Sequence, residues 1–193
     1  MEREIVLTGI GGQSVQLAAQ ILARAAALER RDVLMLGTFG GTMRGGNTES
    51  TLIIGDGPLE TPPIVSHVWA ALVMHHAFFE PVCRKLRPGG VVVVNSALFE
   101  GDLDRDLFQV FDVPATQIAA GLGQPLAASL VLVGAFTGLT GVVALESLVE
   151  AMSESVPSYR RQHLETNEKA LRAGFESVGA GAAPAWAESR RAG

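Results

Sequence analysis

The sequence predicts an α/β domain of three layers, in which helices cover both faces of a mainly parallel, Rossmann-like sheet. Short apolar runs typical of buried strands alternate along the chain with segments of helical periodicity. Hydrophobic residues make up 48% of the 193 residues and charged residues only 18%, which indicates a sheet buried on both faces or a surface covered by another subunit. We assign residues 1–176 to a single domain. Residues 177–193 lack periodicity, so we expect a tail that is flexible or draped over a partner.

The first half of the chain predicts three strands and one helix. Residues 5–8 form an apolar run, and a helical pattern of small and apolar residues begins at Val15. Residues 33–36 predict a second buried strand. Residues 47–54 alternate polar with small or apolar side chains and predict a strand with one exposed face. Because no helix separates these last two strands, we expect a mixed sheet.

The second half continues the alternation. The predicted strands are residues 69–74, 91–94 and 108–114, and RPGG before the second of them predicts a turn. The predicted helices are residues 75–86, kinked or restarted at Pro81, a segment beginning at Ala115, and residues 126–139, 145–152 and 159–175.

Composition excludes several classes of protein. A net charge of −5 without a basic stripe argues against nucleic acid binding. The charge-free tract from Val113 to Leu145 is long enough to cross a membrane, but its glycines and prolines favour a buried or subunit-covered helix.

The single cysteine, Cys83, allows neither an internal disulfide nor an iron–sulfur cluster held by this chain alone. We expect Cys83 to be buried rather than reactive, and the protein to be cytoplasmic.

A glycine-rich turn joins the first predicted strand to the first predicted helix in the stretch IVLTGIGGQSVQLAAQ. Free N–H groups at the start of a helix, together with the helix dipole, can bind an anion such as a phosphate. The residues of this candidate anion loop are Gly9, Gly11, Gly12, Gln13 and Ser14. Alternatively, the glycines only allow the helix to pack closely on the strand.

The nicotinamide-binding fingerprint fits this loop incompletely. It requires a third glycine where Ser14 stands, and an acidic residue for the ribose at the end of the second strand. That strand is followed by Gly37 and Thr38. A stand-alone nicotinamide-dependent oxidoreductase is therefore the alternative hypothesis.

A second glycine cluster, GGTMRGGN, follows the carboxyl end of the second strand, where ligand crevices lie in open α/β sheets. Arg44, Gly45 and Gly46 could hold a polyphosphate together with the first loop, or Arg44 could pair with a nearby acidic side chain. Asn95 follows four valines at the end of a predicted central strand. It is a further candidate for the same crevice, or an amide that caps the next turn.

These two clusters resemble the gamma subunit of the 2-oxoacid:ferredoxin oxidoreductases, a family of pyruvate, 2-oxoglutarate, 2-oxoisovalerate, indolepyruvate and phenylglyoxylate enzymes. The resemblance rests on GIGGQSVQLAAQILARAAAL followed by FGGTMRGGNTESTLIIG, with LRPGGVVVVNS, VPATQIAAGLG and NEKALRAG further along, and it spans about residues 4–175. Ser14 replaces the usual last glycine of the first loop, and Ser129 stands where an asparagine often precedes the hydrophobic helix.

The resemblance implies a subunit of a complex that oxidatively decarboxylates a 2-oxoacid to an acyl-CoA. It implies that thiamine diphosphate, Mg and iron–sulfur clusters belong to alpha, beta and delta partners, and that electrons pass to ferredoxin or another acceptor. Coenzyme A would be shared at the subunit interface, its pyrophosphate on the two glycine loops. A non-catalytic scaffold whose loops bind nothing is the other alternative.

We assign no catalytic residue and no metal ligand to this chain. His75 and His76 are adjacent, and neighbouring positions rarely coordinate one metal together. The sequence contains no G-x-S-x-G elbow of the kind that hydrolases use.

Overall fold

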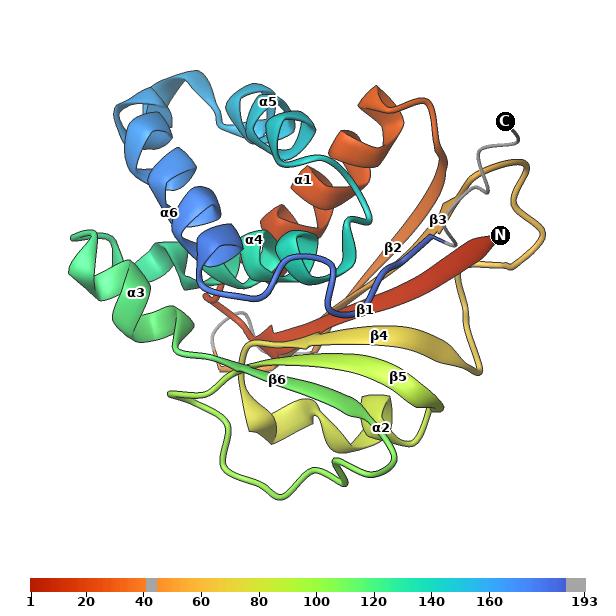
Figure 1. Ribbon diagram of the computed structural model, residues 1–193. Coiled ribbons are helices and arrows are strands. Elements are labelled where there is room, and N and C mark those ends of the chain that lie inside the picture. Colours follow the sequence, from red (N-terminus) through yellow and green to blue (C-terminus); the bar gives the residue numbers. More distant parts are fainter. Residues whose placement is uncertain (41–44, 187–193) are drawn as a thin grey trace.

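The computed structural model describes residues 1–40 and 45–186, apart from the side chains of residues 158–160 (Figure 1). Strands predominate up to residue 113, and the elements that follow are helices. The strands are β1 (Glu2–Ile10), β2 (Asp32–Phe39), β3 (Asn47–Gly55), β4 (Val68–Val73), β5 (Leu86–Asn95) and β6 (Gln109–Val113). The α-helices are α1 (Val15–Leu28), α2 (Glu80–Cys83), α3 (Ala115–Gly121), α4 (Ala128–Thr140), α5 (Leu145–Ser155) and α6 (Leu164–Glu176). Three short 3-10 helices are η1 (His76–Phe78), η2 (Pro125–Ala127) and η3 (Ser158–His163).

Within the described residues the strands form one mixed sheet in the order β2-β3-β1-β4-β5-β6. β1 pairs in parallel with β4, β4 with β5, and β5 with β6, whereas β3 runs antiparallel to both β1 and β2. The prediction of an α/β fold with a mainly parallel, mixed sheet is confirmed.

Two strands differ from prediction in their burial. β3 was expected to have one exposed face, but it lies between β1 and β2 and is buried over nearly its whole length. β2 was expected to be buried, but it is the edge strand, and the side chain of Leu34 is 40% exposed. Both differences have one cause: β3 inserts beside β1 and displaces β2 to the edge, an order that local hydropathy does not encode.

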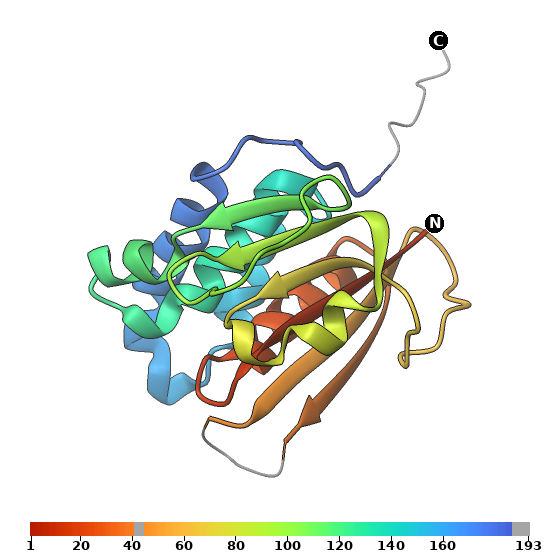
Figure 2. The same ribbon diagram turned by 90° about the horizontal axis from the view of Figure 1, so that it is seen from below.

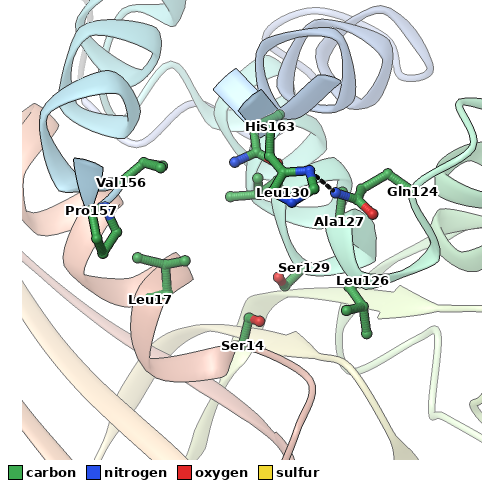
Figure 3. A pocket seen from close by; sticks show the side chains of 11 residues that line it. Ser14, Leu17, Gln124, Leu126, Ala127, Ser129, Leu130, Val156, Pro157 and His163 are labelled. Carbon is green, nitrogen blue, oxygen red and sulfur yellow. Dashed lines mark hydrogen bonds between the residues drawn. The ribbon is translucent and has the colours of Figure 1, made fainter. Parts of the chain in front are cut away.

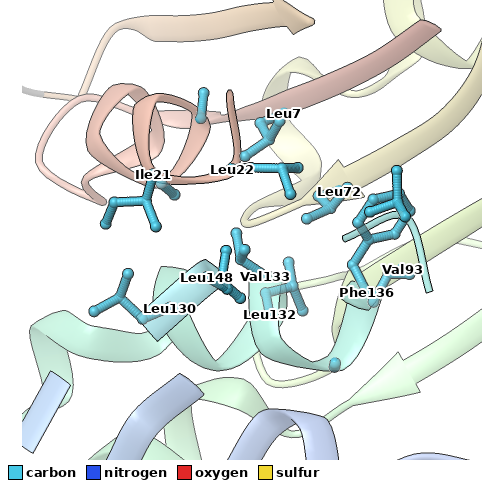
Figure 4. Close-up of a cluster of buried hydrophobic side chains, with 14 of the residues drawn as sticks. Leu7, Ile21, Leu22, Leu72, Val93, Leu130, Leu132, Val133, Phe136 and Leu148 are labelled. Atoms are coloured by element: carbon cyan, nitrogen blue, oxygen red, sulfur yellow. The ribbon is translucent and has the colours of Figure 1, made fainter. Parts of the chain in front are cut away.

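The helices are distributed unequally over the two faces of the sheet. α1 and α3 to α6 cover one face, and α2 lies on the other, which is turned toward the viewer in Figure 2. The larger core cluster fills the space between α1, α4 and the sheet (Figure 4). α4 is buried almost all round, from Ser129 to Thr140.

The charge-free tract that begins at Val113 folds into several separate elements, namely the end of β6, then α3, η2 and α4. None of the helices in the described part of the chain is long and apolar enough to cross a membrane.

The segment predicted as a helix over residues 75–86, kinked or restarted at Pro81, does restart there, because α2 begins at Glu80 with Pro81 in its first turn. It is shorter than predicted: it contains only η1 and the four-residue α2, and β5 already begins at Leu86. The RPGG sequence does not form the predicted turn. It lies inside β5, where the register of pairing with β4 shifts. Cys83, expected to be buried, is partly exposed, and partial burial together with the nearby Glu80 raises the pKa of its thiol.

The start of the C-terminal tail differs from the expected flexible or partner-draped segment. The N–H groups of Ala183 and Ala185 donate to the carbonyls of Leu139 and Thr140, at 2.9 and 2.7 Å. Both alanines are buried. Residues 181–186 therefore pack on the protein's own core, against the end of α4, because the last carbonyls of a helix need donors. Residues 187–193 lie outside the described residues.

Candidate functional site

The two glycine segments meet at the carboxyl ends of β1 and β2, joined by backbone hydrogen bonds. The N–H of Gly11 donates to the carbonyl of Gly46 at 2.8 Å, and the N–H of Gly45 donates to the carbonyl of Gly11 at 3.3 Å. The prediction that the loops lie together therefore holds for these residues. Arg44, the cation predicted for this site, lies outside the described residues.

The first loop is shaped by its glycines and by the amide of Gln13. The amide oxygen of Gln13 accepts from the N–H of Ile10 at 2.9 Å, and its nitrogen donates to the carbonyl of Met74 at 3.4 Å. A side chain at Gly9 would collide with Gln13 and Met74, so this glycine serves close packing. Gly12 adopts a φ of +103°, which favours glycine, and a Cβ there would meet no atom of the described residues within 4 Å. Close packing therefore accounts for Gly9, whereas the backbone conformation of the turn accounts for Gly12.

The start of α1 carries the features of an anion site. Ser14 is its N-cap residue, in a left-handed conformation with φ 58° and ψ 26°, and no side chain of the described residues caps the helix. The first turn of α1 contains no acidic residue. Backbone N–H groups of this turn and the positive end of the helix dipole are thus available to a negative group.

A cavity of about 450 Å³ opens at this point between the two segments. Its described lining is Gly11, Gly12, Ser14, Val15, Gln16, Phe39, Gly40, Asn47 and Thr48. Among these, the aromatic side chain of Phe39 is 75% exposed. The cavity combines backbone donors, amide groups and an exposed aromatic ring, a set suited to a phosphate-bearing ligand with an aromatic base.

Gln16 is a site residue that sequence reasoning missed. Its amide nitrogen donates to the carbonyl of Glu49 at 2.8 Å, and its oxygen accepts from the hydroxyl of Ser50 at 2.7 Å. These bonds attach the first turn of α1 to β3 beside the cavity. The available signal was a polar residue next to the apolar helical positions, which predicts only an exposed side chain.

Asn95 lies at the end of β5 and is 1% exposed. Its amide oxygen accepts from the N–H of Thr116 at 3.3 Å, and its nitrogen donates to the hydroxyl of Thr116 at 2.9 Å. The same nitrogen donates to the carbonyl of Met74, which Gln13 also contacts. These contacts fit the alternative of a capping amide, because Asn95 fastens the start of α3 to the sheet and does not line the cavity.

His75 and His76 stack with their ring centroids 4.6 Å apart. The Nδ1 atom of His76 lies 3.1 Å from the carbonyl oxygen of Leu98, and the N–H of Ala77 donates to Nδ1 of His75 at 3.1 Å. Partial burial and the neighbouring His76 lower the pKa of His75. In the described part of the chain no three His, Cys, Asp or Glu residues gather as a metal site would require.

A family model described as pyruvate ferredoxin/flavodoxin oxidoreductase matches residues 4–177. The 2-oxoglutarate synthase subunit KorC of Methanocaldococcus jannaschii is 33% identical over 160 residues, which cover 81% of this chain and 85% of that protein. The gamma subunit of a keto/oxoacid ferredoxin oxidoreductase from Geobacter sulfurreducens is 30% identical with a TM-score of 0.77, over 90% of this chain and 96% of that one.

A third comparison shows the fold within a larger enzyme. The 2-oxoglutarate:ferredoxin oxidoreductase from Magnetococcus marinus, solved with 2-oxoglutarate, coenzyme A and succinyl-CoA bound, has a TM-score of 0.82 at 19% identity. The match covers 93% of this chain and 32% of that chain. The family model and these relatives match the chain over most of its length. The chain therefore belongs to the pyruvate ferredoxin/flavodoxin oxidoreductase family and corresponds to the gamma subunit.

Proposed function

We propose that this chain acts as the gamma subunit of a multi-subunit enzyme that oxidatively decarboxylates a 2-oxoacid to an acyl-CoA, and that its paired glycine loops bind the pyrophosphate of coenzyme A. The observation that carries the proposal is the cavity of about 450 Å³ where both loops and the uncapped start of α1 meet. A pyrophosphate placed there would receive backbone N–H groups from the helix start.

The donors for that pyrophosphate are limited by the loop pairing. The N–H of Gly11 already donates to Gly46, so it is not available to a phosphate. The remaining candidates are the N–H groups around Gly12 and in the first turn of α1, with the guanidinium of Arg44 as the charged partner. Among the described residues no atom lies where a side chain of residue 12 would stand, which permits close approach of a phosphate oxygen to Gly12.

The other cofactors belong to partner chains in this proposal. One cysteine cannot hold an iron–sulfur cluster, so the clusters lie on partner subunits. The thiamine diphosphate and its Mg lie on the alpha, beta and delta partners as well. Electrons then leave through those subunits to ferredoxin or another acceptor. The complex works in the cytoplasm.

Replacing Arg44 with alanine in the complete, purified complex tests the coenzyme A contact. A lost charge-assisted contact of about 1–3 kcal/mol raises the KM for coenzyme A roughly 5-fold to 150-fold and leaves the KM for the 2-oxoacid unchanged. Arg84→Ala is the matched control, because Arg84 pairs with Glu80 on α2, on the other face of the sheet.

Two results would contradict the proposal. An unchanged KM for coenzyme A in Arg44→Ala favours a scaffold whose loops serve only packing. Purification of the chain without thiamine- and cluster-bearing partners, together with micromolar binding of NAD or NADP, favours a stand-alone nicotinamide-dependent enzyme.

A further inference from the structure

A second cavity, of about 320 Å³, lies between the start of α1, the start of α4 and the η3–α6 junction (Figure 3). Of the described lining residues, it shares one, Ser14, with the cavity of the glycine loops. Its size falls within the range of small-molecule sites in proteins. The coenzyme A proposal makes no use of it.

The hydroxyl of Ser129 indicates that this cavity binds a ligand. Ser129 is only 2% exposed, and its oxygen has no hydrogen-bond partner among the described residues. Buried hydroxyls in native proteins nearly always have a partner, so an orphan that lines a cavity points to a polar group that is bound there. In Figure 3 the hydroxyl oxygens of Ser129 and Ser14 both point into the space between α1 and α4.

The electrostatics of this end of the cavity favour a negative group. Ser14 is the N-cap residue of α1, no side chain of the described residues caps this helix, and the helix dipole places partial positive charge there. Gln124 and His163 close the polar side, with the amide nitrogen of Gln124 2.9 Å from Nδ1 of His163. No Asp, Glu, Lys or Arg contributes to the described lining. Hydroxyls, amides and one helix start suit a single negative charge, whereas a phosphate dianion would lack a Lys or Arg partner among the described lining residues.

The remaining wall of the cavity is apolar. Leu17 of α1, Leu130 of α4 and Val156 after α5 line it. Leu126, 73% exposed, lies at the same cavity. A ligand that fills this space therefore carries a short hydrocarbon chain behind its charged head.

We propose that this cavity is a second binding site, separate from the glycine loops, for a short straight-chain carboxylate. Its carboxylate accepts a hydrogen bond from Ser129 and lies at the start of α1, and its chain packs on Leu17, Leu130 and Val156.

Calorimetric titration of the full-length chain with pentanoate tests the site. The expected result is saturable binding at one site, about tenfold weaker in Ser129→Ala, because that variant loses a hydrogen bond to a charged group. Thr137→Val is the matched control. Thr137 is another buried, unpartnered hydroxyl on α4, but it does not line the cavity, so its replacement leaves pentanoate binding unchanged.

Ser129→Ala keeps the fold, because it removes an unsatisfied buried hydroxyl and adds no volume. Two competitors complete the test: pentanamide and inorganic phosphate bind more weakly than pentanoate. The proposal is overturned by the absence of saturation up to about 20 mM pentanoate, by equal affinity in Ser129→Ala, or by equal binding of pentanamide. Stronger binding of phosphate overturns it as well. None of these outcomes depends on Arg44, so this site and the coenzyme A contact fail or stand separately.

Discussion

At the scale of single residues, Ser14 departs from what its backbone favours. It holds φ at 58° and ψ at 26°, where side chains other than glycine are strained by about 1–2 kcal/mol. The resemblance places a glycine at this position in most family members. In this strained conformation the serine lines both cavities.

Ser14→Gly is expected to raise the free energy of unfolding by about 0.5–1 kcal/mol, because relief of the left-handed strain exceeds the extra flexibility of glycine in the unfolded chain. Ser14→Ala retains the strain and should bring no gain. Urea unfolding of both variants measures the difference, and a destabilised Ser14→Gly variant would show that another contact holds this conformation.

At the scale of elements, the crossing of α4 and α6 depends on glycines on both helices. A Cβ at Gly134 would collide with the backbone of Leu171, and a Cβ at Gly174 would collide with the backbone of Val131. The neighbours are backbone atoms, which cannot move as the end of a side chain can. The helices therefore approach as closely as their main chains allow, and α4 is buried almost all round as a result.

Gly134→Ala is expected to destabilise the protein by about 1–3 kcal/mol, since the added methyl forces the helices apart. Gly121→Ala serves as the control with the opposite sign. Gly121 ends α3 at the surface, and no atom of the described residues lies within 4 Å of the site of a Cβ, so alanine there should stabilise by up to about 1 kcal/mol. Thermal and urea unfolding distinguish the two. A neutral Gly134→Ala variant would mean that the crossing tolerates a wider spacing.

At the scale of the whole molecule, residues 181–186 connect distant parts of the chain. The indole nitrogen of Trp186 donates to the carbonyl of Val142 at 3.1 Å, and the guanidinium of Arg31 lies 4.0 Å from the centroid of its ring. The side chain of Arg3 donates to the carbonyl of Ala185 and lies over the ring of Trp69. The tail thus joins β1, the α1–β2 turn and the end of α4.

Trp186→Ala is expected to lower the free energy of unfolding by about 2 kcal/mol, because it removes both an indole hydrogen bond and a half-buried ring. In a double-mutant cycle with Arg31→Ala, the coupling energy should be about 0.5–1 kcal/mol, as for a partly exposed cation–π pair. Zero coupling would mean that Arg31 and Trp186 stabilise the protein independently.

Elements whose signal is local were predictable from the sequence. The strands at β1, β4 and β6, and the helices α1, α4 and α5, lie close to their expected positions because apolar spacing and turn residues mark them. The helix expected over residues 75–86 restarts at Pro81 as predicted, but the early pairing of Leu86 with β4 leaves room for only one turn after it. At the site, the glycine segments were recognisable, whereas Gln16 and the orphan hydroxyl of Ser129 depend on contacts between distant segments.

The sequence by itself determined the fold class, the family and the two glycine segments, since these depend on periodicity, glycine spacing and motif order along the chain. Only the tertiary structure decided that β3 enters the sheet beside β1, that the tail closes on α4, and that Ser14 and Ser129 line one cavity. The physical reason is that burial and hydrogen-bond partners depend on which distant segments meet. Ser14 and Ser129 stand 115 positions apart in the sequence, and they line the same cavity only because α1 and α4 pack together on the same face of the sheet.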